Sequence, residues 1–209
     1  MTKFNSLKTS GFSLIETLIA ITILMIAITG PLSLVQAGLF SSNHERNEVT
    51  AIYLAQEAIE FIKNVRDSNS YSQYTGSTVS WLTIPYPDQQ HKNTLLTDNA
   101  AACGVSCYVD PHGTLSGSNL YIEPVSAQPN QYLRLYVPTG RTIITYRYGQ
   151  GTLTPFIRTV TITPVADSQT VSGYNEVTVT VTVTWNDNLA PRSYTISTNL
   201  FNYEQGSGS

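Results

Sequence analysis

Residues 12–40 read FSLIETLIAITILMIAITGPLSLVQAGLF, and this stretch decides the architecture of the chain. From Thr17 to Phe40 no residue is charged, and apolar side chains occur on all sides of a helical projection. As an α-helix, these residues extend about 36 Å, which exceeds the ~30 Å hydrocarbon core of a bilayer. The stretch therefore predicts a membrane-crossing helix, with Lys3 and Lys8 before it holding its first end in the cytoplasm.

The helical pattern continues past the apolar run as far as residue 66. Charge returns at Glu45, and residues 41–66 become amphipathic. Their apolar stripe contains Ile52, Ala55, Ile59 and Ile62, with Ala51, Ala58 and Val65 beside it. A helix over residues 12–66 is much longer than the usual three or four turns. We therefore predict that residues 41–66 lie against a folded body, whereas residues 12–40 form a transmembrane or filament-core helix.

One pair of helix-disfavouring residues, Gly30 and Pro31, lies inside the apolar run. Proline removes one helical hydrogen bond and clashes with the preceding turn, and glycine adds backbone freedom. We predict a kink or a locally unwound stretch at this pair.

The C-terminal third of the chain has the alternation of β-strands. EVTVTVTVTW, residues 176–185, places four valines and Trp185 on one face and threonines on the other. Further strands are predicted at residues 192–198, 156–163, 142–148 and 132–137, and WNDNLAP reads as a hairpin turn. Short connections favour antiparallel pairing. The predicted fold is α+β, with the second half of the helix covering an antiparallel sheet of four to five strands within residues 131–205.

The middle of the chain, residues 67–130, lacks a clear period and contains several prolines. We predict a long variable loop with short local elements, in which Trp81 and Leu82 contact the core. Residues 206–209, GSGS, are expected to be a flexible tail, either native or a remnant of cloning.

Composition limits the partners of this chain. Only 12 % of its 209 residues are charged and the formal net charge is −3, so no basic footprint for nucleic acid is evident. Cys103 and Cys107 are too few for a structural zinc site. In an exported protein they are expected to close a small disulfide loop, with two free thiols as the alternative.

The stretch Lys8-Thr-Ser-Gly11-Phe12-Ser-Leu-Ile-Glu16 joins a basic leader to the apolar helix. It resembles the prepilin signal of type IV pilins and type II secretion pseudopilins. The helix segment AIYLAQEAIEFIKNVRDS and the strands TPFIRTVTIT and VTVTVTW also look like those of minor pilins and pseudopilins. The resemblance implies a leader peptide of residues 1–11, cleavage by a prepilin peptidase between Gly11 and Phe12, and N-methylation of Phe12.

The chemistry of Glu16 supports an assembly role. A carboxylate inside a bilayer costs on the order of 3 kcal/mol at the helix centre, and the helix N-terminus recovers part of that. Cleavage creates a cationic partner, the amine of Phe12. In a filament this amine of one subunit could meet Glu16 of its neighbour, so that only a processed subunit assembles. The alternative is that Glu16 sits at the headgroup boundary.

Two other interpretations of the N-terminus stay open. Val35-Gln36-Ala37 before Gly38 fits a secretory signal-peptide cleavage site, although the apolar run is longer than usual. A permanent single-pass anchor would explain the apolar helix but not the Gly-Phe-x-x-x-Glu arrangement.

The sequence offers little for catalysis or metal binding. The histidines His44, His91 and His112 are scattered without HExxH spacing, and GxSxG is absent. Gly149-Gln150-Gly151 reads as a turn. Asn186, Asp187 and Asn188 carry oxygens that suit calcium, but are more typical of a plain turn. We expect no enzymatic activity, no cofactor and no metal.

The expected function is that of a structural minor subunit of a type IV pilus or pilus-like filament. A minor pseudopilin of a type II secretion system and a filament-presented adhesin are the alternatives. The resemblance implies other pilin subunits, a prepilin peptidase and an inner-membrane assembly platform with its ATPase as partners. The precursor would span the cytoplasmic membrane once and then join an extracellular or periplasmic filament.

Overall fold

A computed structural model describes residues 11–76, 80–83, 103–112, 122–125, 131–140, 143–166, 169–170, 173–187 and 190–203. Residues 1–10 of the leader with Lys3 and Lys8, the residues His91 and Asn188, and the tail 206–209 lie outside the described residues. The chain divides into two compact units, Met1–Arg46 and Asn47–Ser209.

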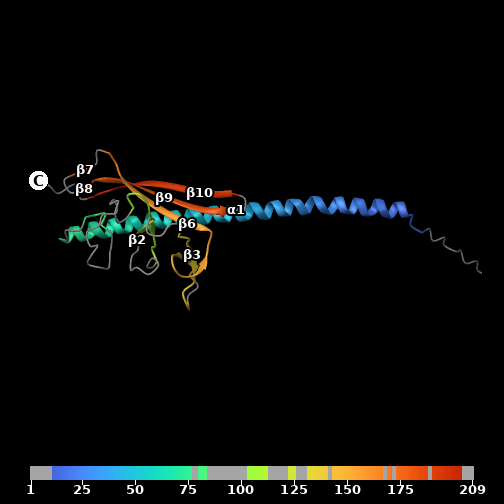
Figure 1. Cartoon of the computed structure of the whole chain (residues 1–209), viewed down its shortest axis with the longest axis horizontal. Helices are drawn as coiled ribbons and strands as arrows, with labels where there is room; N and C mark the ends of the chain where they lie inside the picture. The colour runs from blue at the N-terminus through green and yellow to red at the C-terminus, as the bar shows by residue number, and fades with distance from the viewer. Residues whose placement is uncertain are drawn as a thin grey trace, which may run out of the picture. The chain divides into compact units, whose positions relative to one another are not determined.

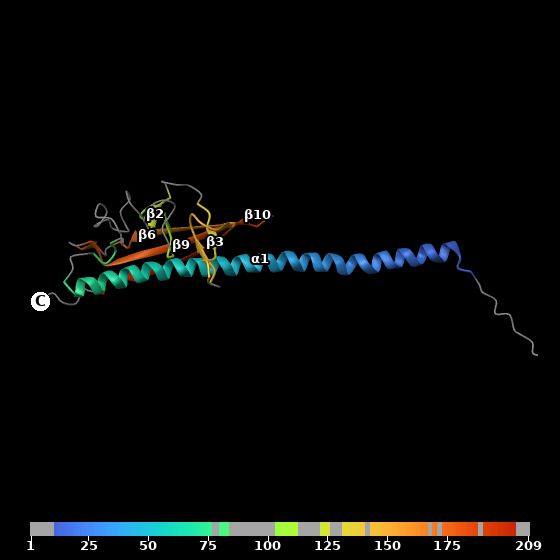
Figure 2. The same cartoon turned by 90° about the horizontal axis from the view of Figure 1, so that it is seen from below.

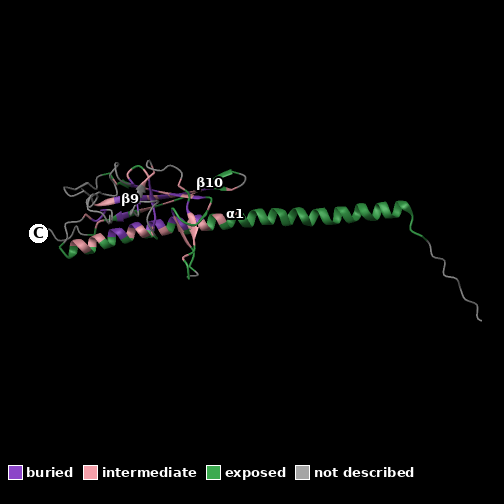
Figure 3. Ribbon diagram, turned by 60° about the horizontal axis from the view of Figure 1, so that its bottom comes forward, coloured by how far each residue is buried: buried purple, intermediate pink, exposed green. Residues whose placement is uncertain are grey.

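The helix α1, Leu14–Tyr74, contains 61 residues (Figure 1). Its residues 14–46 belong to the first unit and residues 47–74 to the second. In the first unit the helix is exposed, whereas in the second unit one stripe of it is buried (Figure 3). The division falls after Arg46, and the first buried residue of the helix is Ala51, so the predicted boundary between residues 12–40 and 41–66 stays a prediction.

The buried stripe of α1 lies slightly off the predicted one. The fully covered positions are Ala51, Leu54, Ala55, Ala58, Ile59, Ile62, Val65 and Arg66. Leu54 replaces Ile52, which is only half-buried. Small alanines at three of these positions let the helix backbone approach the sheet closely, so the larger side chains interlock around them.

The helix continues eight residues beyond the predicted end at residue 66. This extension is polar, and tertiary contacts hold it: the Asn69 side-chain amide donates to the carbonyls of Trp81 and Thr83, at 3.2 and 2.8 Å. The helix ends at Tyr74, and Gly76, two residues later, has a φ of +95°, a left-handed conformation that glycine adopts without strain.

The main sheet has five strands in the order β10-β9-β6-β1-β2, all antiparallel. Its strands are β1 (Cys107–Val109), β2 (Ile122–Pro124), β6 (Phe156–Pro164), β9 (Glu176–Asp187) and β10 (Ala190–Phe201). Alternate residues of β9, from Val177 to Trp185, are buried, as the sequence predicts. Figure 2 shows the second-unit part of α1 running along one side of this sheet.

Two smaller sheets complete the described fold. One has the order β4-β3-β5, with β3 (Arg134–Tyr136), β4 (Thr145–Arg147) and β5 (Thr152–Leu153). The other pairs β7 (Gln169–Thr170) with β8 (Gly173–Tyr174).

The predicted α+β class and antiparallel sheet are confirmed, but the strand membership was partly wrong. The strands expected at residues 132–137 and 142–148 do not join the main sheet; they form the small sheet through β3 and β4. The main sheet is completed instead by β1 and β2, from the segment predicted to be a long loop. Three-residue strands are too short to show a period, so only their non-local pairing reveals them.

Two local predictions also have outcomes. Trp81 and Leu82 are buried in the core, as expected. The predicted turn WNDNLAP is shorter than expected, because Asn186 and Asp187 are paired with Pro191 and Ala190 across the β9–β10 ladder. The two strands therefore extend almost to the chain reversal.

Cys103 and Cys107 form a disulfide in the structure, and both are fully buried. The small loop they close is attached to β6, since the backbone N–H of Ile162 donates to the Cys103 carbonyl at 2.7 Å. The Thr161 hydroxyl donates to the carbonyl of Val105 at 3.2 Å. The disulfide thus holds the entry to β1 beside β6.

Candidate processing and assembly site

The predicted cleavage site lies just before the first turn of α1. Gly11, Phe12 and Ser13 precede the helix, and the Phe12 side chain is 80 % exposed. A Cβ atom added to Gly11 would meet no atom within 4 Å in the described part of the chain. The described contacts of the chain would therefore accommodate a Cβ atom at this position.

Ser13 starts the helix as its N-cap. Its carbonyl accepts the backbone N–H groups of Glu16, at 3.0 Å, and Thr17, at 3.2 Å. Ser13-Leu14-Ile15-Glu16 has the spacing of a capping box, in which the acid three residues after the cap supports the first turn. This spacing is visible in the sequence, and it adds a local structural role to the assembly role predicted for Glu16.

The first-unit part of α1 presents an apolar surface. Among the residues described, α1 is long and apolar enough to cross a bilayer, judged by length and composition. Each hydroxyl between Thr17 and Phe40 donates to the carbonyl three residues earlier; the donors are Thr17, Thr22, Thr29 and Ser33. These internal hydrogen bonds satisfy the hydroxyls without water, as a lipid environment requires.

Gly30 and Pro31 both lie within the helix, and the helical conformation runs through them without interruption. Pro31 has no N–H to give to the carbonyl of Ala27. The Ser33 hydroxyl donates to the Gly30 carbonyl at 2.8 Å, which satisfies one neighbouring acceptor. A bend at this pair stays a prediction.

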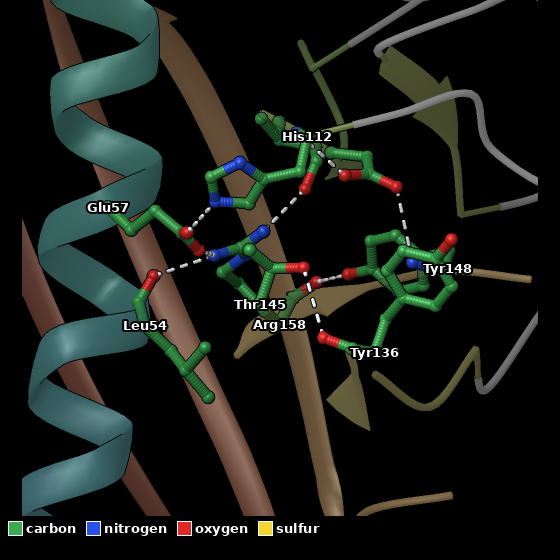
Figure 4. Close-up of polar contacts among 9 residues, drawn as sticks. Leu54, Glu57, His112, Tyr136, Thr145, Tyr148 and Arg158 are labelled. Carbon is green, nitrogen blue, oxygen red and sulfur yellow. Dashed lines mark hydrogen bonds and ion pairs between the residues drawn. The ribbon is translucent and has the colours of Figure 1, made fainter. Parts of the chain in front are cut away.

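A cluster of polar side chains, which we call the Arg158 cluster, lies in the second unit between α1 and the sheet (Figure 4). Arg158 is fully buried on the face of β6 that also carries Phe156 and Val160. Its Nη1 donates to the Leu54 carbonyl at 2.9 Å and to Glu57 Oε2 at 2.5 Å. Its Nη2 donates to the carbonyl of Val109 at 2.7 Å. One guanidinium thus joins α1, β1 and β6.

The Arg158 cluster extends through two further residues. His112 Nε2 lies 2.6 Å from Glu57 Oε1. The buried carboxylate of Asp110 accepts the backbone N–H of His112 at 3.0 Å and that of Tyr148 at 3.2 Å. Asp110 therefore fixes both the turn after β1 and the end of β4, which are far apart in the sequence.

Sequence reasoning missed this cluster. It treated His112 as scattered and found no pairing for the carboxylates. One signal was present: Arg158 occupies an inward position of the alternating strand FIRTVTIT, where an apolar residue is expected. A cation at such a position requires a buried partner, but the sequence does not say that the partner is Glu57 on the helix.

Tyr148 makes the stability of this cluster sensitive to alkaline pH. Its hydroxyl donates to the Arg158 carbonyl at 3.0 Å, and burial raises the pKa of Tyr148 well above its ordinary value of 10.0. Ionisation thus favours the unfolded chain. The contribution of neutral Tyr148 to the free energy of unfolding is fully present below pH 10. It falls by about 1.4 kcal/mol per pH unit as the pH rises above 10.

We predict that Tyr148→Phe weakens this dependence. The variant should lose about 1 kcal/mol at neutral pH with the hydrogen bond, but decline less steeply above pH 10. Urea unfolding of the full chain in detergent, followed by tryptophan fluorescence, measures this, because Trp81 and Trp185 both lie in the folded body. Tyr71→Phe, at an exposed tyrosine, is the control; equal alkaline slopes for Tyr148→Phe and wild type would contradict the assignment.

Metal-ligand clusters are not found in the described ranges: no group of three His, Cys, Asp or Glu side chains is placed to hold an ion there. Of the three residues weighed for calcium, Asn186 and Asp187 belong to β9 and Asn188 is outside those ranges.

Comparison with known proteins identifies the N-terminus. Residues 7–30 match the prokaryotic N-terminal methylation motif, and this match includes Gly11, Phe12 and Glu16. Neither the curated proteins nor the solved structures gave a match to the chain. The chain has an α+β fold, and its N-terminal apolar helix fits a membrane-anchored precursor. The matched motif is typical of type IV pilin and pseudopilin precursors, and it supports a processed subunit of that kind.

Proposed function

We propose that this chain is a structural minor subunit of a type IV pilus or pilus-like filament. The supporting observation is the arrangement Gly11-Phe12-x-x-x-Glu16 at the start of a helix whose apolar surface has no cover among the described residues. Prepilin peptidase cuts after Gly11 and methylates the amine of Phe12. The subunit acts through assembly.

Before assembly, the apolar part of α1 spans the cytoplasmic membrane with its N-terminus in the cytoplasm. Extraction into the filament, by an assembly platform and its ATPase, moves that helix from lipid into a bundle of similar helices. The helix surface suits both surroundings, because its hydroxyls are satisfied internally and its side chains are apolar. Glu16 then pairs with the methylated amine of a neighbouring subunit.

The N-terminus of the mature protein tests this proposal. Mass spectrometry of the protein from its native membrane should find N-methylated Phe12 as the first residue. A chain that begins at Gly38 would instead indicate signal-peptide cleavage, and an intact leader would indicate a permanent anchor. Either result would overturn the proposal.

Gly11→Val should block processing. The structure leaves room for the side chain, so the fold is unaffected, while the extra atoms obstruct entry into the peptidase cleft. A misplaced scissile bond slows cleavage on the order of a hundredfold. Uncut precursor should accumulate in the membrane, as seen by mass spectrometry. Gly38→Val, at an open position within α1, is the control and should be processed normally.

The same N-terminal helix serves a type II secretion pseudopilin, which is the nearest alternative. Deletion of the gene separates the two: loss of surface filaments supports the pilus, and loss of protein export with normal filaments supports the secretion system. An adhesin would instead leave filament number unchanged and reduce attachment.

A further inference from the structure

The small sheet β4-β3-β5 has one face turned away from the core. Tyr146 of β4 packs on the core, with its ring 6.3 Å from that of Phe156. The strand register identifies the residues on the opposite face. Arg134 is paired with Arg147 and with Leu153, and Tyr136 is paired with Thr145. We call these five residues the outer face: Arg134, Tyr136, Thr145, Arg147 and Leu153.

The outer face carries two arginines directly opposite each other on β3 and β4. Like charges at such positions repel. Arg134 Nη1 donates to the Gly151 carbonyl at 3.2 Å, and the Arg147 guanidinium lies 4.7 Å from the centre of the Tyr136 ring. Within the described ranges no carboxylate forms an ion pair with either arginine. The pair therefore favours an external anion.

The stretch of sequence that contains the outer face is also positively charged. Residues 124–166 contain four arginines and no aspartate or glutamate, although the whole chain carries a net charge of −3. One of the four, Arg158, is neutralised by Glu57. This segment is thus locally basic in an acidic protein.

Apolar side chains flank the outer face. Val137, Ile143, Ile144 and Leu153 are all more than half exposed. Figure 3 shows exposed residues at the free end of this small sheet, which Figure 1 shows beside the main sheet. Exposed aliphatic side chains next to arginines match the chemistry of a lipid headgroup boundary.

The other face of the small sheet is turned toward α1. There Tyr146 lines a cleft of about 360 Å³ together with Thr50, Tyr53, Leu54 and Glu57 of α1.

We propose that the outer face and its flanking aliphatic residues bind the anionic phospholipid surface of the membrane that holds the precursor. The guanidinium groups of Arg134 and Arg147 bind lipid phosphates as bidentate donors, and Val137, Ile143, Ile144 and Leu153 enter the headgroup boundary. This inference rests on the proposed function, because it requires the apolar helix to be in a bilayer. It would keep the waiting subunit docked on the membrane before assembly.

Hydrogen exchange of the full chain in nanodiscs tests this binding. The amides of residues 132–137 and 143–147 should exchange at least fivefold more slowly in nanodiscs containing phosphatidylglycerol than in phosphatidylcholine alone. Because each basic residue contributes about fivefold to binding at an anionic surface, Arg134→Gln with Arg147→Gln should abolish the difference. Salt at 0.5 M should also reduce it. Ile143→Ser with Ile144→Ser should weaken it without changing the salt dependence.

Matched controls separate this inference from loss of folding and from the proposed function. Arg192→Gln changes an exposed arginine on β10 and should leave the protection intact. Unchanged exchange of β6 and β9 amides shows that each variant is folded. Co-elution of the chain with nanodiscs tests the membrane-spanning helix by itself. Equal exchange rates in the two lipids would overturn the proposed lipid binding. Protection that appears in detergent and rises with protein concentration would also overturn it, and would indicate that a second copy of the chain covers the outer face.

Discussion

Glu16→Gln is expected to remove this subunit from filaments while leaving it in the membrane. Glutamine serves as well as glutamate at the third helical position of a capping box, so the capping-box spacing that begins at Ser13 survives at the start of α1. Only the negative charge is lost. Breaking a buried ion pair by removing one partner costs about 3–5 kcal/mol, which corresponds to a fall of roughly 10²- to 5 × 10³-fold in incorporation.

Glu16→Leu removes both the charge and the cap acceptor and should fail in the same way. The measurement is the amount of each variant in sheared filaments relative to the membrane fraction, by quantitative immunoblot. Mass spectrometry of the N-terminus shows whether each variant is still cut and methylated. Glu48→Gln, at an exposed position of α1 beyond the apolar run, is the charge-matched control and should assemble normally.

The two variants distinguish the two roles of Glu16. If Glu16→Gln assembles like wild type and Glu16→Leu does not, the residue acts as a helix cap and the pairing with the amine is wrong. Normal assembly of both variants would exclude both roles.

The second large effect is expected at Glu57. Replacement by methionine leaves the Arg158 guanidinium fully buried with two backbone carbonyls and no counterion. We expect the free energy of unfolding of the body to fall by about 3–5 kcal/mol. Urea unfolding of the full chain in detergent, followed by the fluorescence of Trp81 and Trp185, measures this loss.

A double-mutant cycle makes the prediction specific. Because replacing both members of a buried pair with apolar residues is often neutral, Glu57→Met with Arg158→Met should be more stable than Glu57→Met alone. Glu60→Met, which disrupts only the exposed pair with Lys63, should change the stability by less than about 1 kcal/mol. Additive losses in the cycle would show that Glu57 and Arg158 do not stabilise one another.

The sequence was sufficient where one residue type repeats with a clear period. β6 and β9 alternate buried and half-buried residues over their first seven and ten positions, so their strands and inward faces could be predicted closely. The uncharged run before Glu45 likewise predicted an exposed apolar helix. The residues of the predicted processing site are close neighbours in the chain, so the motif match over residues 7–30 needs only the sequence.

Prediction failed where an element is short or stabilised from a distance. β1 and β2 have three residues each and are fixed by pairing with each other and with β6. The last turns of α1 are polar, and Asn69 holds them by contacts twelve and fourteen residues away. The outer face also depends on register, because its two arginines are thirteen positions apart in the sequence and adjacent only across the ladder.

By itself, the sequence determined the apolar helix, the processing motif and the long alternating strands, because each is encoded by neighbouring residues through a fixed period or spacing. Only the tertiary structure decided that Glu57 meets Arg158, that Asp110 joins β1 to β4, and that two arginines share one face of a separate small sheet. Those contacts join residues distant in the chain. Their geometry depends on how the helix and strands pack, which no local pattern specifies.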